Sequence, residues 1–163
     1  MLRRVFARDA RVTLPCAMGE RAGKAPIHVS ARDDSSSLLP IGTEQDRIFP
    51  GTAEVAVEHI EMRRLDDVLQ RADIAAPALL KLDVQGYELH ALRGCVTLLD
   101  AFAWVYCECS FVELYAGQAL ADEVIAWLRA HGFALIGAYN MAFDHDGRAV
   151  QADFLFARHG LGA

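Results

Sequence analysis

Two nearly continuous apolar runs, separated by one helical stretch, constrain the fold of this chain most. Residues 78–83 (ALLKLD) and 104–109 (WVYCEC) are both strand-sized and mostly apolar. Runs of this kind are typical of parallel strands buried on both faces of a sheet. Gly86 interrupts the first run, and apolar residues at helical spacing after Tyr87 predict a helix that leads to the second run. A right-handed crossover of this kind usually makes its two strands neighbours in one sheet.

The segments on either side of this unit predict further strands and helices. On the N-terminal side we predict the end of a helix at 2–9, a hairpin of strands 11–17 and 26–30, a strand at 55–62 and a helix at 65–72. On the C-terminal side we predict an amphipathic helix at 120–130 and two antiparallel strands, 133–139 and 151–157, joined by a turn at Asp146-Gly147. The serine-, proline- and glycine-containing stretch 31–52 predicts a flexible loop.

This order of elements predicts one α/β domain over residues 1–163. The sheet is expected to be mostly parallel, with an antiparallel last strand and with helices on both faces. A length of 163 residues is normal for one domain, and 53% hydrophobic residues are enough for a core.

Charge and hydropathy exclude several partners. The net charge of −6 argues against nucleic acid, because phosphate binding needs a basic surface. No apolar run approaches the roughly 20 residues of a membrane span. Residues 1–6 contain no apolar stretch long enough for a signal peptide, so we expect a cytoplasmic protein. Four cysteines match no zinc-binding spacing, and we expect no metal site.

Two carboxylates stand at the ends of the apolar strands. Ligands of open α/β sheets bind beyond the carboxyl ends of the strands, so Asp83 and Glu108 are expected to face one crevice. Asp83 could accept a proton from a substrate hydroxyl or hold the ammonium group of a cofactor. Its alternative role is to accept backbone N–H groups in the turn. Glu108 could act in the same crevice, or pair with Lys81 or with backbone donors.

Other polar residues near these strand ends have two interpretations each. Glu88 stands in the first turn of the helix, where its negative charge either interacts favourably with the helix dipole or acts on a ligand. His90 lies on the same helix and is either a base or a satisfied surface histidine. Ser36 and Ser37 either cap a helix or line a substrate loop.

Several segments resemble one enzyme family. Residues 80–89 (LKLDVQGYEL), followed by LRG at 92–94, resemble the signature stretch of FkbM-type methyltransferases. Supporting similarities occur at Ala17–Gly19, Ser35–Leu38, Arg64–Asp67, Cys107–Phe111, Leu114–Gln118 and Gln151–Phe156. The central motif is specific, and the resemblance spans nearly the whole chain.

The resemblance implies a Rossmann-like fold and a function. Such enzymes transfer a methyl group from S-adenosylmethionine to an acceptor, usually a hydroxyl, here on a small molecule or a saccharide. Together with the patterns above, it predicts catalytic roles for Asp83, Glu108 and His90. The predicted cofactor-binding residues are Ala17, Gly19, Asp83 and Gln85, and the predicted substrate-binding residues are Ser36, Ser37, Glu88 and Tyr115.

The sequence departs from the family at the cofactor-binding segment. The family's first strand and Gly-rich turn have no counterpart here, because Gly19 and Gly23 flank a predicted hairpin turn. We therefore expect a domain truncated at its N-terminus, with an incomplete site and weak or no binding of S-adenosylmethionine. A homodimer could cover the exposed sheet edge.

Two other functions are kept as alternatives. One is a non-catalytic interaction module with the same fold. The other is a nucleotide- or sugar-binding α/β protein of another family, against which the missing phosphate loop argues.

Overall fold

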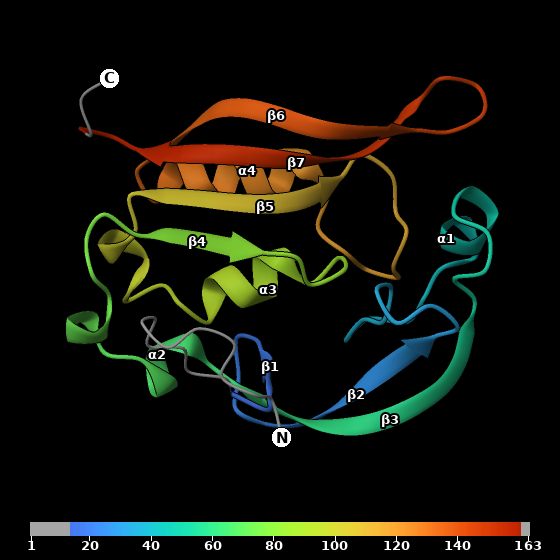
Figure 1. Ribbon diagram of the computed structural model, residues 1–163, viewed down its shortest axis with the longest axis horizontal. Helices are drawn as coiled ribbons and strands as arrows, with labels where there is room; N and C mark the ends of the chain where they lie inside the picture. Colours follow the sequence, from blue (N-terminus) through green and yellow to red (C-terminus); the bar gives the residue numbers. More distant parts are fainter. Residues whose placement is uncertain (1–13, 161–163) are drawn as a thin grey trace, which may run out of the picture.

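The protein folds into two sheets in the computed structural model, which describes residues 14–160 (Figure 1). The larger sheet has the order β4 (Leu79–Leu82), β5 (Trp104–Ser110), β7 (Ala149–Arg158), β6 (Phe133–Phe143). The smaller sheet has the order β1 (Ala17–Met18), β3 (Glu54–Arg63), β2 (Gly23–Ser30). The helical segments are α1 (Thr43–Ile48), α2 (Leu65–Val68), η1 (Arg71–Asp73), α3 (Glu88–Arg93), η2 (Leu99–Ala101) and α4 (Ala121–Ala130).

The crossover predicted from the two apolar runs is confirmed. Strands β4 and β5 are parallel neighbours, with Leu82 opposite Cys107, and α3 lies between them in the chain. Leu82 and Cys107 lie opposite each other, and Asp83 and Glu108 are the residues that follow them in the sequence. The two carboxylates are therefore at the same edge of the sheet. The antiparallel C-terminal hairpin of β6 and β7 is confirmed as well.

The larger sheet is mixed, which corrects the prediction of a mostly parallel sheet. Only β4 and β5 pair in parallel, whereas β7 is antiparallel to both β5 and β6. The N-terminal strands do not extend this sheet, because they pair with one another instead. Strand β3 pairs antiparallel with β2 and parallel with β1, so the described part of 11–17 does not form the predicted hairpin with 26–30. The helix predicted at 2–9 lies outside the described residues.

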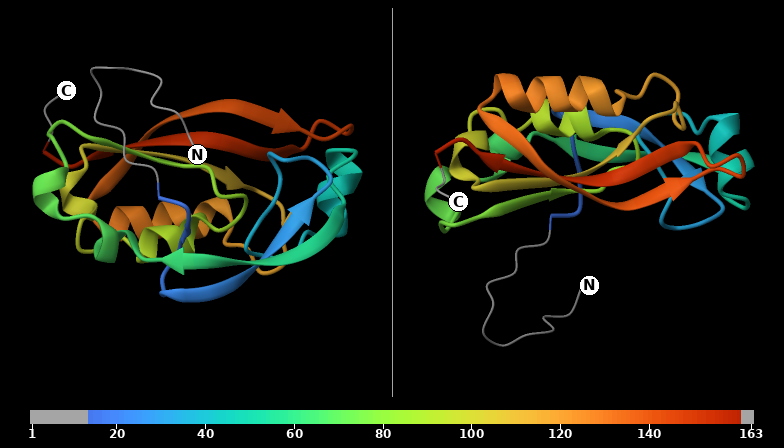
Figure 2. Two further views of the ribbon diagram at one scale, coloured as in Figure 1. Left: turned by 60° about the horizontal axis from the view of Figure 1, so that its bottom comes forward. Right: turned by 90° about the horizontal axis from the view of Figure 1, so that it is seen from above.

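Helices cover one face of the larger sheet, not both as predicted. Helices α3 and α4 lie on the same side of it, and no described helix lies on the other side (Figure 2). The main core forms on the helix side, and its fully buried members include Leu92, Val105, Leu128, Phe133 and Phe156. Strand β4 is an edge strand whose Leu79 is 53% exposed, so it is not buried on both faces as its apolar sequence predicted.

Two further segments differ from their predictions. The stretch 31–52 is not all loop, because it contains the six-residue helix α1. The helix predicted at 65–72 is divided into α2 and η1. Arg64 is the N-cap residue of α2, and its guanidinium pairs with the Asp66 carboxylate at 2.9 Å. Within residues 14–160 no helix has the length and apolar character that crossing a bilayer requires.

Candidate functional site

A sharp turn after β4 organises the candidate site. Gln85 and Gly86 both have positive φ angles, 52° and 87°. A side chain on Gly86 would meet the Tyr115 ring at 3.0 Å, so both space and backbone conformation favour glycine here. Below the turn, the buried Glu88 carboxylate accepts the N–H groups of Val84 (3.2 Å) and Gly86 (3.3 Å). Glu88 therefore fixes the turn from the inside.

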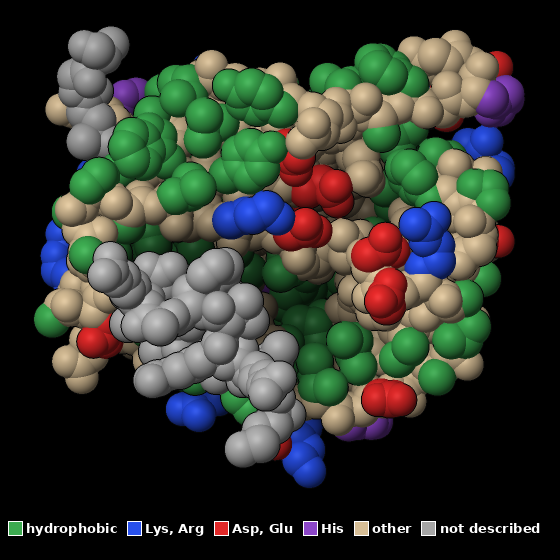
Figure 3. Space-filling view, viewed as in Figure 1, with side chains coloured by type: hydrophobic (Ala, Val, Ile, Leu, Met, Phe, Trp, Pro, Cys, Tyr) green, Lys and Arg blue, Asp and Glu red, His purple; other side chains and the backbone are tan. Residues whose placement is uncertain are grey.

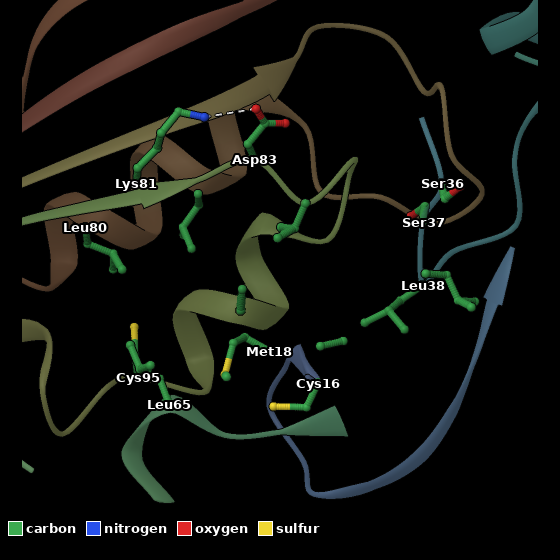
Figure 4. Close-up of a pocket in the computed structure, with 15 residues that line it drawn as sticks. Cys16, Met18, Ser36, Ser37, Leu38, Leu65, Leu80, Lys81, Asp83 and Cys95 are labelled. Atoms are coloured by element: carbon green, nitrogen blue, oxygen red, sulfur yellow. Dashed lines mark hydrogen bonds and ion pairs between the residues drawn. The ribbon is translucent and has the colours of Figure 1, made fainter. Parts of the chain in front are cut away.

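Side-chain contacts hold the Asp83 carboxylate on two sides. Its Oδ2 accepts a hydrogen bond from Lys81 Nζ at 2.9 Å (Figure 4). Its Oδ1 accepts one from Gln85 Nε2 at 2.9 Å. The Gln85 Oε1 atom in turn accepts the Tyr115 hydroxyl at 2.8 Å. The Asp83 side chain stays 50% exposed, so it is oriented and still open to a ligand.

Two pockets share Asp83. The first, here called the apolar pocket, has a volume of about 460 Å³ and is lined mainly by apolar side chains, among them Ala17, Leu38, Leu80 and Val84 (Figure 4). The second, here called the polar pocket, has a volume of about 290 Å³. It is lined by Arg32, Asp34, Ser35, Gln45, Phe49, Thr52, Asp83, Gln85, Glu108 and Gln151. Acidic side chains gather beside the hollow on this face of the molecule (Figure 3).

Glu108 reaches the polar pocket from β5. Its Oε1 accepts a hydrogen bond from Gln151 Nε2 on the neighbouring strand β7 at 2.9 Å. Burial and, to a smaller extent, the negative charges of Asp83, Glu88 and Asp153 together raise the pKa of Glu108 to about 7. The structure thus brings Asp83 and Glu108 to one pocket, and a carboxyl group with a pKa near neutrality can exchange a proton there.

The buried Glu88 should make stability depend on pH. Burial raises its pKa from 4.5 to about 7. The folded state therefore binds this proton more tightly than the unfolded state. The stabilisation is complete below pH 4.5 and is lost as the pH rises to about 7, by up to about 3 kcal/mol. Glu108 acts in the same direction.

We expect Glu88→Gln to reduce this pH dependence. The amide oxygen can still accept the two turn N–H groups, and no charge is buried at high pH. Urea unfolding at pH 5 and pH 8 would measure the effect. The wild-type protein should be less stable at pH 8, and the variant should lose much less. A wild-type protein that is more stable at pH 8 than at pH 5 would contradict the assignment.

The serine segment and Tyr115 support the turn. Ser36 and Ser37 both line the apolar pocket. The Ser37 hydroxyl donates to the Gln85 carbonyl oxygen at 2.7 Å. The buried Tyr115 hydroxyl is within 3.1 Å of the Ser35 carbonyl oxygen, in addition to its contact with Gln85. In the described structure Ser37 and Tyr115 therefore hold Gln85 in place.

The other predicted site residues are spread over the pocket and its surroundings. Ala17 lines the apolar pocket, but Gly19, Glu88 and His90 line neither pocket. Gly19 is packed so tightly that an added Cβ would lie 2.5 Å from Met62 Sδ. His90 stacks on Tyr87 with ring centroids 4.4 Å apart, and its Nδ1 lies 3.4 Å from Glu20 Oε1. The contacts of His90 therefore lie outside the two pockets.

Several lining residues of the polar pocket were not singled out from the sequence. Arg32, Asp34 and Gln45 come from the stretch predicted to be a loop, and Gln151 comes from the last strand. The spacing of these residues in the sequence does not indicate a site, because each reaches the pocket only through tertiary packing.

The described residues offer one group of three closely spaced metal-ligand side chains, Asp144, His145 and Asp146. It lies in the β6–β7 turn, where Asp144 Oδ1 accepts the N–H groups of Asp146 and Arg148. Those hydrogen bonds give Asp144 a structural role in the turn.

Comparisons with known proteins agree with the motif at the turn. The model of the methyltransferase FkbM domain matches residues 3–135, which is more than half of the chain. The chain is similar to the 31-O-demethyl-FK506 methyltransferase FkbM of Streptomyces tacrolimicus, with 32% identity over 80 residues. That match covers 49% of this chain and 29% of the relative, and no solved structure matches. The length of the family match and the motif around Asp83 show that the chain belongs to the FkbM methyltransferase domain family.

Proposed function

We propose that this chain acts in S-adenosylmethionine-dependent methyl transfer to a hydroxyl group, with Asp83 between the methyl donor and the acceptor. Family membership supports methyl transfer in general. One observation carries the finer proposal: Asp83 lines both an apolar pocket and a polar pocket. We further propose that β4, β5, β7 and β6 correspond to one half of a Rossmann-like methyltransferase sheet.

The residues of the apolar pocket fit the cofactor. A volume of about 460 Å³ falls in the usual range of small-molecule sites. The apolar wall, with Ala17, Leu38 and Val84, suits the adenosyl ring, and Asp83 suits the ammonium group. When bound, this cofactor supplies a methyl group activated by a sulfonium centre. The residues around it need to position the acceptor, exclude water and take up a proton.

The polar pocket suits the acceptor. Glu108 is the residue that would take up the hydroxyl proton, since its pKa near 7 leaves much of it ionised at neutral pH. The Gln151 amide would orient the carboxylate through its hydrogen bond to Oε1. Gln85 would keep Asp83 aimed between the two pockets.

Binding of S-adenosylhomocysteine, the demethylated cofactor, would test the proposal. We expect weak but saturable binding, seen as a rise in melting temperature at millimolar ligand and as heat in calorimetry. Asp83→Asn should weaken it at least tenfold. Asp122→Asn, whose side chain lines neither pocket, should bind like the wild-type protein. Equal binding by Asp83→Asn, or no saturable binding to any of the three proteins, would contradict the cofactor assignment.

The homodimer expected from the sequence stays a prediction. In the described sheet β4 pairs on one side only, with β5, so its other edge is available for a strand of a second copy. Sedimentation velocity across a range of protein concentrations would measure the association.

A further inference from the structure

The lining of the polar pocket includes a buried amide whose oxygen has no hydrogen-bond partner. Gln45 on α1 lines this pocket and is only 4% exposed. Within residues 14–160 its Oε1 atom has no hydrogen-bond partner. Buried carbonyl oxygens nearly always have a hydrogen-bond partner, because an unpaired one loses its hydrogen bonds to water without gaining another. The oxygen therefore lacks a donor, which a ligand in this pocket would supply. Because the oxygen has almost no exposed surface, the Gln45 side chain has to turn toward the pocket for this contact to form.

Most of the remaining polar groups of this pocket are acceptors as well, and the Arg32 guanidinium is the charged donor among them. Asp34, Asp83 and Glu108 contribute three carboxylates. One side-chain N–H of Gln85 already donates to Asp83, and one of Gln151 already donates to Glu108. A ligand that fills the pocket should therefore bring several donors of its own, together with an acceptor for Arg32. An apolar acceptor would displace water from these oxygens without offering them a hydrogen bond, which is unfavourable.

The arrangement favours an extended ligand over a metal ion. In the described part of the chain, the carboxylates of the polar pocket are not among the groups of three ligand atoms within 4.8 Å of one another. Its acceptors are therefore spread along the wall and not focused on one point. Phe49 is the one aromatic side chain of the lining and offers an apolar surface among the polar groups. A pyranose ring matches this wall, since it carries hydroxyl donors around its edge and apolar C–H groups on its faces.

We propose that the polar pocket is the acceptor site for a saccharide, and that Gln45 Oε1 accepts a hydrogen bond from one of its hydroxyl groups. This proposal rests on the proposed function where it calls the saccharide the methyl acceptor, whereas binding of a saccharide to this pocket can be tested without it. Gln45 is then a residue that selects polyhydroxylated acceptors over apolar alcohols.

Binding of simple glycosides to the full chain tests this without any methyl donor. The probes are methyl glycosides of glucose, mannose, galactose, fucose and glucosamine, with cyclohexanol as the apolar alcohol. Saturation-transfer NMR detects binding, and calorimetry gives the Kd. We expect at least one glycoside to bind and cyclohexanol to bind more weakly or not at all.

Gln45→Leu is the decisive variant. Leucine has a side chain of similar size and removes the unpaired oxygen, so the melting temperature should stay equal or rise. Glycoside binding should weaken at least tenfold. Gln70→Leu is the matched control, because the exposed Gln70 lines neither pocket, and it should bind normally. Asp34→Asn changes a side chain that is 63% exposed, so folding is not at risk, and it should weaken binding several-fold.

Three outcomes would overturn the saccharide proposal: no glycoside binds, Gln45→Leu binds as well as the wild-type protein, or cyclohexanol binds more tightly than every glycoside. Its failure is distinguishable from failure of the proposed function. Glycoside binding that persists without any binding of S-adenosylhomocysteine would refute the methyl-donor assignment alone. Cofactor binding that depends on Asp83, without glycoside binding, would refute the saccharide proposal alone.

Discussion

Replacing Gly94 with alanine is expected to destabilise the protein by about 3 kcal/mol or more. A Cβ atom at this position would lie 2.0 Å from the Gly19 carbonyl oxygen and 2.8 Å from its carbon. Both are backbone atoms, so no side-chain rotation relieves the clash. The backbone is held on the Gly94 side too, because its carbonyl oxygen accepts the Asp66 N–H at 3.0 Å. For a chain of this size the melting temperature should fall by roughly 6–12 °C.

Gly132→Ala is the control that separates this clash from backbone conformation. Gly94 has helical angles (φ −78°, ψ −6°), so alanine strains nothing there except the packing. Gly132 has φ 86° but no atom within 4 Å of an added Cβ, so alanine would cost about 1 kcal/mol through conformation alone. Urea unfolding of both variants gives the comparison. If Gly94→Ala were as stable as Gly132→Ala, the close approach of Gly19 would be wrong.

Glu108→Gln should lower the rate of methyl transfer by about 10²–10⁴-fold, the usual contribution of a general base. This expectation rests on the proposed function. Glutamine keeps the size of the side chain and can still accept the Gln151 hydrogen bond, but it cannot take up a proton. Acceptor affinity should change little, so the loss should appear in kcat and not in KM. Single-turnover transfer of a radiolabelled methyl group to the best-binding glycoside would measure it.

The pH profile gives a second measure of the same residue. The base form of Glu108 increases as the pH rises through its pKa of about 7, so wild-type kcat should rise and then level off above that pH. The rise should be absent in Glu108→Gln and unchanged in Glu58→Gln, which alters an exposed carboxylate on β3. NMR titration with ¹³C-labelled glutamate would show the pKa directly. A Glu108 carboxyl that titrates near 4.5 would argue against its role as a base.

The sequence predicted the position of the candidate site more correctly than it predicted the fold around the site. The apolar runs ending at Asp83 and Glu108, with one crossover between them, correctly predicted two parallel neighbours and a shared pocket. The pairing of β3 was not predictable in the same way. Its alternating pattern shows that it is a strand, but not whether β2, β1 or the larger sheet supplies its partner.

Glu88 and Gln45 show why residue roles were harder to assign. The position of Glu88 at the start of a helix was evident, but only its burial shows that the carboxylate holds the turn from the inside. Gln45 had no signal at all, because one glutamine in a polar stretch looks like a surface residue. Its importance comes from burial without a hydrogen-bond partner, which is a property of the packed structure.

The sequence by itself determined the local units: the crossover from β4 to β5, the turn after Asp83, the amphipathic helix α4 and the C-terminal hairpin. These depend on residues close together in the chain, whose spacing and turn chemistry are visible in one dimension. Only the tertiary structure decided which strands share a sheet, which face stays uncovered and which side chains meet around Asp83. The contacts responsible join distant segments, such as Ser37 with Gln85, 48 residues apart, and Ser35 with Tyr115, 80 residues apart. Such contacts form only when the whole chain has packed, because burial and pKa depend on everything that surrounds a group.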